Sequence, residues 1–407
     1  MRFRKLDKFK FVCVNCGKSY NKVTYLCPDC EKEESLPPKG VLKICYDYHR
    51  IKKSYSELKL ENFLPLLPIK KLSSLPKLRV GNTPLYKVDK LKNRTKLPFK
   101  LFIKDDGQNP TYSYKDRASA MVCAYAKENG LNKIVAASTG NAGSSLAGIC
   151  ASTGQTAIIM VPKTAPLAKL TQILMYGAKL ITVDGNYDMA FDFSIKASKK
   201  YGWYNRNTAY NPITVEGKKT VSFELFGQLE KKIPDKIFVS VGDGCIISGL
   251  YKGFEDLMKI GIIKKMPTII GVQSEKSANT INNLKNSTFL VVPATTLADS
   301  ISVDIPRNFY MTKQFIQKYN GQMVTVSDEK ILVASKTVAE STGIFSEPAA
   351  ACAMAGLLKY YEKGQIGENE SCVVLLTGCG LKDLKSVQKI IFMPKAIKPN
   401  LEYLKSF

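Results

Sequence analysis

Short apolar runs, separated by polar turns and amphipathic segments, recur along most of the chain. The apolar runs predict strands at residues 101–104, 133–137, 156–161, 179–183, 236–241, 268–273 and 371–376. Between them, apolar residues at helical spacing predict helices, for example at 187–200, 248–260 and 327–340. Strands that alternate with helices favour parallel sheets covered by helices on both faces. The pattern therefore predicts an α/β protein.

The start of the chain has a different character. Cys13 and Cys16 form one Cys-x-x-Cys pair, and Cys27 and Cys30 form a second pair after ten intervening residues. Four thiolates at this spacing suit a tetrahedral Zn²⁺ ion, which would be structural because no coordination position stays open. Rubredoxin-type iron and a metal-free relic are the alternatives. The charged, proline-containing residues 31–42 are predicted to be a linker.

Composition limits the classes of protein. The 407 residues, 45% of them hydrophobic, suffice for more than one core. No run approaches the ~18 apolar residues of a membrane span, and residues 1–16 lack the apolar region and cleavage site of a secretory signal. The other cysteines are scattered singly, which fits a reducing cytoplasm. The net charge of +25 is spread over the whole chain, which disfavours a nucleic-acid partner and suits anionic substrates.

Candidate chemistry is concentrated between residues 101 and 145. The first strand leads through a polar turn, 105–110, to the sequence SYKDR at 113–117, where Lys115 opens a helix. The next strand ends at the sequence STGN, residues 138–141, before a second helix. Such a pair can present an amine nucleophile beside backbone N–H groups that bind an anion. The positive end of the helix disfavours the ammonium form of Lys115. A surface lysine and ordinary turn chemistry are the alternatives.

These motifs resemble those of pyridoxal-phosphate enzymes with the tryptophan synthase β fold (fold type II), and most closely the threonine synthases. The resemblance covers roughly residues 80 to 390. It implies two doubly wound parallel-sheet domains: a large one from 43–111 and 221–407, and a smaller mobile one at 112–220. The ribbon and linker at 1–42 would precede them, as in many threonine synthases. A homodimer is expected.

The resemblance also implies roles for individual residues. Lys115 would form a Schiff base with the cofactor, Asn141 would hydrogen-bond its 3-hydroxyl, and Thr377 would face its pyridine nitrogen. The substrate carboxylate would bind at Ser138, Thr139 and Gly140. A loop after strand 236–241 would wrap the cofactor phosphate and consists of Gly242, Asp243, Gly244, Cys245 and Ile246.

Two features depart from the family pattern. The loop at 242–246 replaces Gly-Asn-Ala-Gly-Asn, and Asp243 is awkward beside a phosphate unless its carboxylate points away. A dinucleotide-binding turn is the rival interpretation, but this loop lacks the third glycine that such a turn requires. Thr214 stands where an arginine would bind substrate phosphate, so Arg206, with Asn207 and Thr208, is predicted to replace it.

Arg117 is the other candidate for that cation. Glu347 also matches the family, but the sequence assigns it no role.

The implied activity converts O-phospho-L-homoserine and water to L-threonine and phosphate. A threonine or serine ammonia-lyase, or a β-replacement enzyme acting on another amino acid such as phosphoserine, is the alternative enzyme. A zinc-ribbon interaction protein is the non-enzymatic alternative. The only histidine is His49, which leaves little material for a Ser-His-Asp triad or a histidine-ligated catalytic metal.

Overall fold

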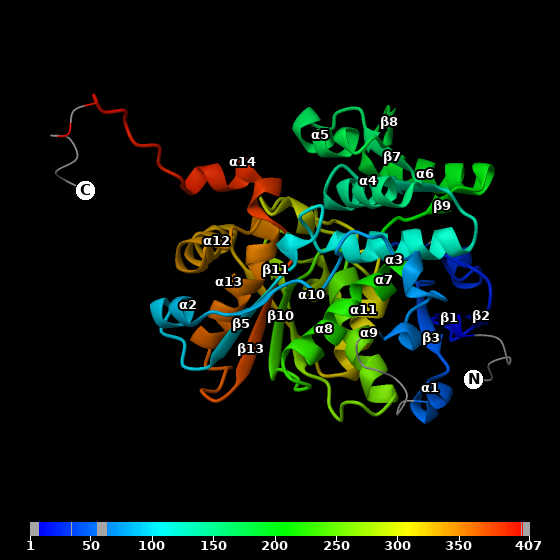
Figure 1. Cartoon of the computed structure of the whole chain (residues 1–407), viewed down its shortest axis with the longest axis horizontal. Helices are drawn as coiled ribbons and strands as arrows, with labels where there is room; N and C mark the ends of the chain where they lie inside the picture. The colour runs from blue at the N-terminus through cyan, green and yellow to red at the C-terminus, as the bar shows by residue number, and fades with distance from the viewer. Residues whose placement is uncertain (1–7, 34, 55–62, 400, 402–407) are drawn as a thin grey trace.

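The computed structural model describes residues 8–33, 35–54, 63–399 and 401, which form three sheets with their helices (Figure 1). Residues 1–7 of the segment considered as a signal, and residue 34 of the predicted linker, lie outside the described residues. All seven predicted strands and the three predicted helices are present within a few residues of their expected ends. In the described part of the chain, no helix is both long and apolar enough to cross a membrane.

The largest sheet has six strands in the order β12-β11-β10-β13-β5-β4. Its strands are β4 (Leu85–Lys87), β5 (Lys100–Asp105), β10 (Lys236–Ser240), β11 (Thr268–Ser274), β12 (Gln322–Val326) and β13 (Ser371–Leu376). All neighbours are parallel except β4, which pairs antiparallel with β5 at the edge. The predicted parallel sheet therefore ends in one antiparallel strand.

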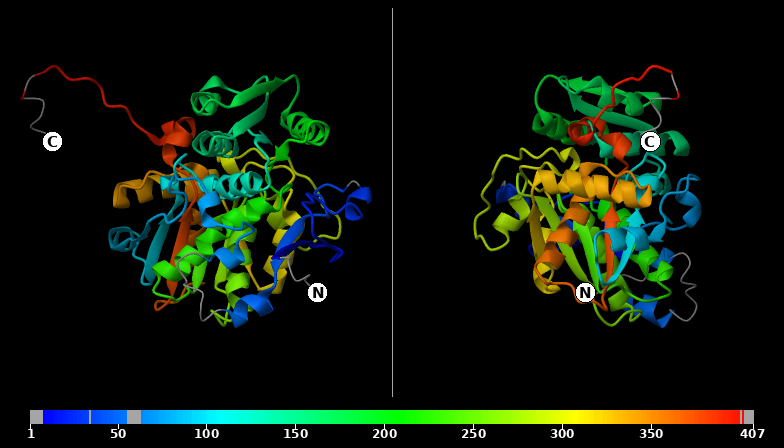
Figure 2. Two further views of the ribbon diagram at one scale, coloured as in Figure 1. Left: turned by 45° about the vertical axis from the view of Figure 1, so that its right-hand side comes forward. Right: turned by 90° about the vertical axis from the view of Figure 1, so that its left-hand side faces the viewer.

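Alternating side chains of this sheet enter two different cores. Phe238 and Val374 pack with α12 (Asp328–Thr342) and α13 (Pro348–Glu362) on one face. Ile237 and Val373 pack on the other face with α8 (Thr220–Gln228), α9 (Cys245–Lys259) and α11 (Phe309–Lys318). Figure 2 shows the sheet between these two helical layers. Both faces are apolar, as the continuous hydrophobic runs predict.

A second sheet of four parallel strands, in the order β8-β7-β6-β9, lies beside the first (Figure 1). It contains β6 (Lys133–Ala137), β7 (Thr156–Pro162), β8 (Lys179–Val183) and β9 (Tyr204–Asn205). The helices of this region are α3 (Lys115–Glu128), α4 (Asn141–Thr153), α5 (Leu167–Met175), α6 (Tyr187–Tyr201) and α7 (Ile213–Lys218). These strands all fall within 112–220, whereas the mobility of this part stays a prediction.

The cysteine-rich region forms a small antiparallel sheet, β2-β1-β3, from β1 (Phe9–Cys13), β2 (Ser19–Tyr20) and β3 (Leu42–Tyr46). The sheet does not stop at the predicted boundary after residue 42, because β3 pairs with β1 as far as Tyr46. Ile44 and Tyr46 are buried in a core that the ribbon shares with the large domain, so the division between the two stays a prediction. The remaining short helices are α1 (Tyr48–Lys53), α2 (Asp89–Arg94), α10 (Asn279–Asn283) and α14 (Leu384–Val387).

Candidate active site

Loops that follow neighbouring strands converge on one region. In the large sheet, β13 lies between β5 and β10, so the loops that leave the carboxyl ends of these three strands are adjacent. In parallel α/β sheets, ligands bind at such an edge. Lys115, Asn141, Glu347, Thr377 and residues 242–246 line one cavity. Residues 138–141 and 206–208 line a second cavity, which shares Lys115, Asn141 and Asp243 with the first.

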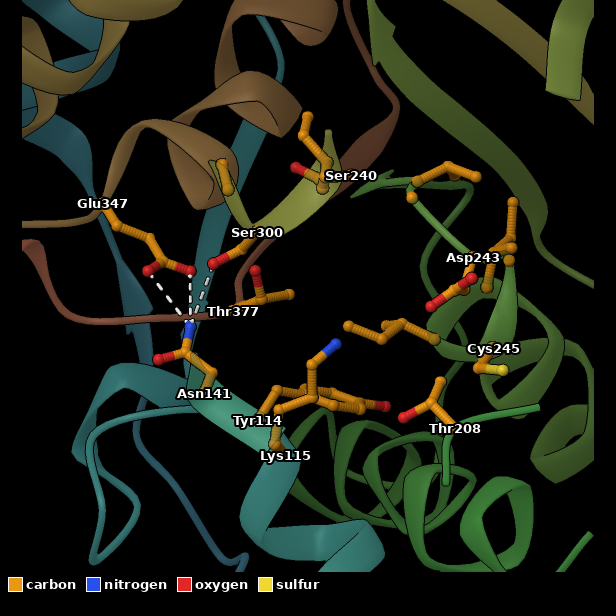
Figure 3. Close-up of a pocket in the computed structure, with 17 residues that line it drawn as sticks. Tyr114, Lys115, Asn141, Thr208, Ser240, Asp243, Cys245, Ser300, Glu347 and Thr377 are labelled. Atoms are coloured by element: carbon orange, nitrogen blue, oxygen red, sulfur yellow. Dashed lines mark hydrogen bonds between the residues drawn. The ribbon is translucent and has the colours of Figure 1, made fainter. Parts of the chain in front are cut away.

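Lys115 stands at the start of α3, which is fixed against the end of β13. The Tyr114 N–H donates to the Thr377 carbonyl at 2.9 Å, and Ser113 forms a β-bridge with Gly378. The Lys115 amine points into the cavity (Figure 3). Burial lowers the pKa of Lys115, and Asp243 opposes this shift. The neutral, nucleophilic form of the amine is therefore more accessible than for a lysine in water.

Asn141 and Glu347 lie at one end of the cavity, and Asp243 and Cys245 lie at the other (Figure 3). The Asn141 side-chain amide donates to both Glu347 carboxylate oxygens at 3.0 and 3.1 Å, and to the Ser300 hydroxyl at 3.2 Å. Gly378 is required here, since a Cβ at this position would lie 2.5 Å from Glu347 Oε1. Burial raises the pKa of Glu347 to about 7, while Asn141 and Lys115 act in the opposite direction. Sequence reasoning gave Glu347 no role, because its partner lies 206 positions away.

The glycine-rich loop between β10 and α9 has a fixed shape. Gly244 has φ +83°, and a Cβ there would lie 2.2 Å from Thr312 Oγ1, so no larger residue fits. The Asp243 carbonyl accepts from the Asn308 N–H at 3.1 Å, and its carboxylate accepts from the Arg307 N–H at 3.3 Å. Asp243 thus caps a backbone group yet still lines both cavities. The loop presents the amino-terminal end of α9 to the first cavity.

Arg206 lies in the wall of the second cavity and is fully buried. Its guanidinium donates to the hydroxyls of Ser119, at 3.2 Å, and Thr208, at 2.9 Å. Its Nη2 has no hydrogen-bond partner within the described residues. Burial lowers the pKa of Arg206 to about 10, so it still carries its charge at neutral pH. A buried cation held by hydroxyls alone has free capacity to bind an anion.

Two other residues considered for the substrate have different surroundings. The Asn207 side chain accepts from the Ala137 N–H at 2.8 Å and donates to Ser194 at 2.7 Å, which ties β6 to α6. Its role toward a substrate stays a prediction. The Thr214 hydroxyl donates to the Asn211 carbonyl at 2.7 Å, inside the first turn of α7.

Arg117, the alternative cation, is fully engaged elsewhere. Its guanidinium forms buried ion pairs with Asp106, at 2.6 Å, and with Glu224, at 2.5 Å. It also donates to the hydroxyls of Thr83 and Thr220. Arg117 lines neither of the two cavities, so between the two candidates the geometry favours Arg206.

The four cysteines of the ribbon form a compact cluster, with all Sγ atoms within 4.8 Å of one another. Cys13 and Cys30 Sγ are 3.7 Å apart, and Cys16 and Cys27 Sγ are 3.6 Å apart. Thiolates at ~2.3 Å from a tetrahedral ion would be about 3.8 Å from each other. The cluster could therefore hold a metal ion. Asn15 donates to Cys30 Sγ at 3.3 Å, as an outer-sphere ligand would.

Comparison of the sequence with known proteins shows the family to which the chain belongs. The sequence profile described as "Pyridoxal-phosphate dependent enzyme" matches residues 77–378. The chain belongs to this family. It is 35% identical to the threonine synthase of Methanocaldococcus jannaschii, over 97% of this chain and 98% of that protein. It is 34% identical to the threonine synthase of Methanosarcina acetivorans, over 97% of each chain.

Solved structures agree with the predicted fold. Threonine deaminase isoform 2 of Solanum lycopersicum superimposes with a TM-score of 0.68 at 23% identity, over 82% of this chain and 88% of that one. Maize serine racemase superimposes with a TM-score of 0.65 at 21% identity, over 77% of this chain and 92% of that one. These neighbours confirm the α/β architecture of fold type II.

The donor set around the first cavity fits pyridoxal phosphate. A buried amine is available for an aldehyde at Lys115, and the amino-terminal end of α9 offers N–H groups to a phosphate. Hydrogen-bonding groups for a pyridine ring stand at the other end, on Asn141 and Thr377. Gly242 and Gly244 line this cavity as well.

Proposed function

We propose that the protein is a threonine synthase, which converts O-phospho-L-homoserine and water to L-threonine and phosphate. The observation that carries the proposal is the match, along nearly the full length of both chains, to threonine synthases at 34–35% identity. The convergence of the residues nominated from the sequence on two adjoining cavities supports it. The enzyme is a pyridoxal-phosphate-dependent carbon–oxygen lyase.

Lys115 is proposed to hold the cofactor covalently and to move the substrate's α-proton on its Nζ atom. Bound pyridoxal phosphate supplies an electron sink for the carbanion that this proton transfer creates. Because burial lowers the pKa of Lys115, the neutral amine that acts as a base forms more readily than it would in water. Thr377 offers the cofactor a hydroxyl instead of a carboxylate, which moderates that sink and favours elimination and replacement.

The cofactor is proposed to lie between two groups of residues. Gly242, Asp243, Gly244, Cys245 and Ile246 would surround its phosphate. At the other end, Asn141 would bind its 3-hydroxyl, and Glu347 would orient the Asn141 amide through the two hydrogen bonds described above. Glu347 is thus a positioning residue in this proposal.

The second cavity is proposed to bind the amino-acid substrate. Ser138, Thr139 and Gly140 precede α4, where hydroxyl and N–H groups can bind the carboxylate. Arg206 and Thr208 would bind the substrate phosphate. Asn207 lies between them in the chain, and its side-chain hydrogen bonds would hold this segment in place. Arg206 is suited to a dianion because a guanidinium forms bidentate hydrogen bonds with phosphate oxygens.

A direct assay tests the proposal. The holoenzyme is incubated separately with O-phosphohomoserine, threonine and phosphoserine, and phosphate, 2-oxo acid and threonine are measured. Threonine and phosphate from O-phosphohomoserine are expected. A 2-oxo acid from threonine would instead support an ammonia-lyase, and phosphate from phosphoserine alone would support a β-replacement enzyme. If no reaction and no bound cofactor were found, the non-enzymatic alternative, a zinc-ribbon interaction protein, would be supported.

We also propose that the cysteine cluster holds Zn²⁺ as a structural ion, because four protein thiolates close the coordination sphere. The enzyme is proposed to act in the cytoplasm as a homodimer. The scattered single cysteines support the cytoplasmic location. Metal analysis and light scattering of the purified protein test the zinc and the dimer.

A further inference from the structure

One lysine of the site region has no partner. Lys218 ends α7 with its side chain fully buried, and its Nζ forms no hydrogen bond with any described residue. The adjacent Lys219 is equally buried, but it forms ion pairs with Glu216 and with Asp256, the latter at 2.7 Å. The contrast matters because a buried, unpaired ammonium group is costly to the fold.

Lys218 lies beside the first turns of α9. A Cβ on Gly249 would lie 2.7 Å from Lys218 Cβ, so the two helices are in close contact here. The charged or titratable groups that act on Lys218 are Cys245 on α9, Lys115 on α3, Arg206 after β9 and Asp243 in the glycine-rich loop. Each of these four lines one or both cavities of the candidate active site.

No anionic group is paired with the Lys218 amine among the described residues. Burial lowers the pKa of Lys218 to about 7, and the positive charges of Lys115 and Arg206 act in the same direction. Cys245 and Asp243 act in the opposite direction, but neither is hydrogen-bonded to the amine. The amines of Lys218 and Lys115 and the guanidinium of Arg206 thus each interact electrostatically with Cys245, the first residue of α9. The first turn of this 15-residue helix also favours an anion.

We propose that Lys218 is the counter-ion of a phosphate monoester bound at the start of α9, over Cys245. Its ammonium group would offset the negative charge that Asp243 adds to the loop. A dianion at this point would give Lys218 its missing partner and balance the repulsion from Lys115 and Arg206. The phosphate could belong to the cofactor or to the substrate, since both are phosphate monoesters. Only the second source rests on the proposed function.

The test compares Lys218→Met with wild type as apoprotein, with Lys133→Met as a control at the exposed start of β6. Methionine keeps the unbranched apolar stem and removes the charge. Lys218→Met is expected to weaken binding of pyridoxal phosphate by about 30-fold or more, as for truncation of one partner of a buried charge pair. Binding of pyridoxal, which has no phosphate, should not change. The melting temperature of the apoprotein should not fall, whereas loss of a merely structural lysine would lower it.

The phosphate source is decided by two titrations. Weaker pyridoxal phosphate binding with an unchanged KM for O-phosphohomoserine, measured at saturating cofactor, assigns Lys218 to the cofactor phosphate. Unchanged cofactor binding with a raised KM assigns it to the substrate phosphate. Wild-type values for both in Lys218→Met overturn the proposal. Cofactor affinity is measured without substrate, so this result does not depend on which reaction the enzyme catalyses.

A second variant covers the case in which Lys218→Met does not fold. With a pKa of about 7, Lys218 is mostly neutral at pH 8 in the empty site and must gain a proton when it pairs with a phosphate. Calorimetry in two buffers of different ionisation enthalpy measures this uptake. Lys218→Arg, which is always charged, should keep the affinity for pyridoxal phosphate and take up fewer protons. Equal proton uptake by Lys218→Arg and wild type would contradict the proposal.

Discussion

Glu347 provides a test of the site that needs neither cofactor nor substrate. Burial raises the pKa of its carboxyl from the ordinary 4.5 to about 7. As the pH is lowered, a carboxyl whose pKa is higher in the folded state is protonated there at a higher pH than in the unfolded chain. Between pH 4.5 and 7 the folded state therefore holds more protons, and its stability falls as the pH rises through this range.

The size of the effect follows from the shift. At pH 8 both states are ionised, and a shift of 2.5 units corresponds to about 3 kcal/mol of lost stability. At pH 5 the carboxyl is protonated in the folded state and mostly ionised in the unfolded state, so the loss is only about 1 kcal/mol. Glu347→Gln removes the titration. Relative to wild type, the variant should therefore gain about 2 kcal/mol of stability between pH 5 and pH 8.

The assay is chemical unfolding of the apoprotein at several pH values. The change with pH is compared, rather than the absolute stability, because glutamine can accept only one of the two hydrogen bonds from Asn141. That loss does not vary with pH and cancels in the comparison. Glu368→Gln, at an exposed position, serves as control and should follow the wild-type curve. Parallel curves for Glu347→Gln and wild type would refute the reasoning.

Three further predictions concern the chemistry. Lys115→Ala should lose the visible absorbance of covalently bound pyridoxal phosphate after dialysis; a retained band would contradict its role. Cys16→Ser should lower the metal content and the melting temperature together, because the bound metal contributes to folding, and full metal content would count against the site. Arg206→Met should lower kcat/KM for O-phosphohomoserine by about 2–4 kcal/mol without a loss of stability, whereas Arg94→Met, in an exposed ion pair with Glu340, should match wild type.

Much of the architecture was accessible from the sequence because buried parallel strands leave a strong local signal. The strand at 133–137 is a continuous apolar run that ends in STGN, and the structure has β6 at Lys133–Ala137 with α4 beginning at Asn141. Strand β12 (Gln322–Val326) was missed because its burial alternates and it lies at the edge of the sheet. Strand β3 (Leu42–Tyr46) was not predicted because it makes its ladder with β1, about 30 residues earlier, and no local pattern reports such pairing.

Some candidate site residues could likewise be nominated from the sequence, whereas the roles of others required the structure. Lys115 and the glycine-rich loop could be nominated because strand-to-helix junctions carry their own sequence signal. Glu347 could not be given a function, since its burial and its contact with Asn141 appear only when α13 and α4 meet. The sequence favoured Arg206 for its place beside Asn207 and left Arg117 as the other candidate. Only the folded structure shows that Arg117 is neutralised by Asp106 and Glu224.

Lys218 and Lys219 show most clearly where sequence reasoning ends. The two residues are identical and adjacent, and both are fully buried. Successive residues on a helix point about 100° apart, so Lys219 reaches Glu216 and Asp256, while Lys218 is directed to the surroundings of Cys245. One lysine is thereby paired within the protein, and the other has no hydrogen-bond partner among the described residues. In a chain with 60 lysine and arginine residues, the type of residue does not distinguish the two. What distinguishes them is whether a buried partner lies within reach, and only the folded structure shows this.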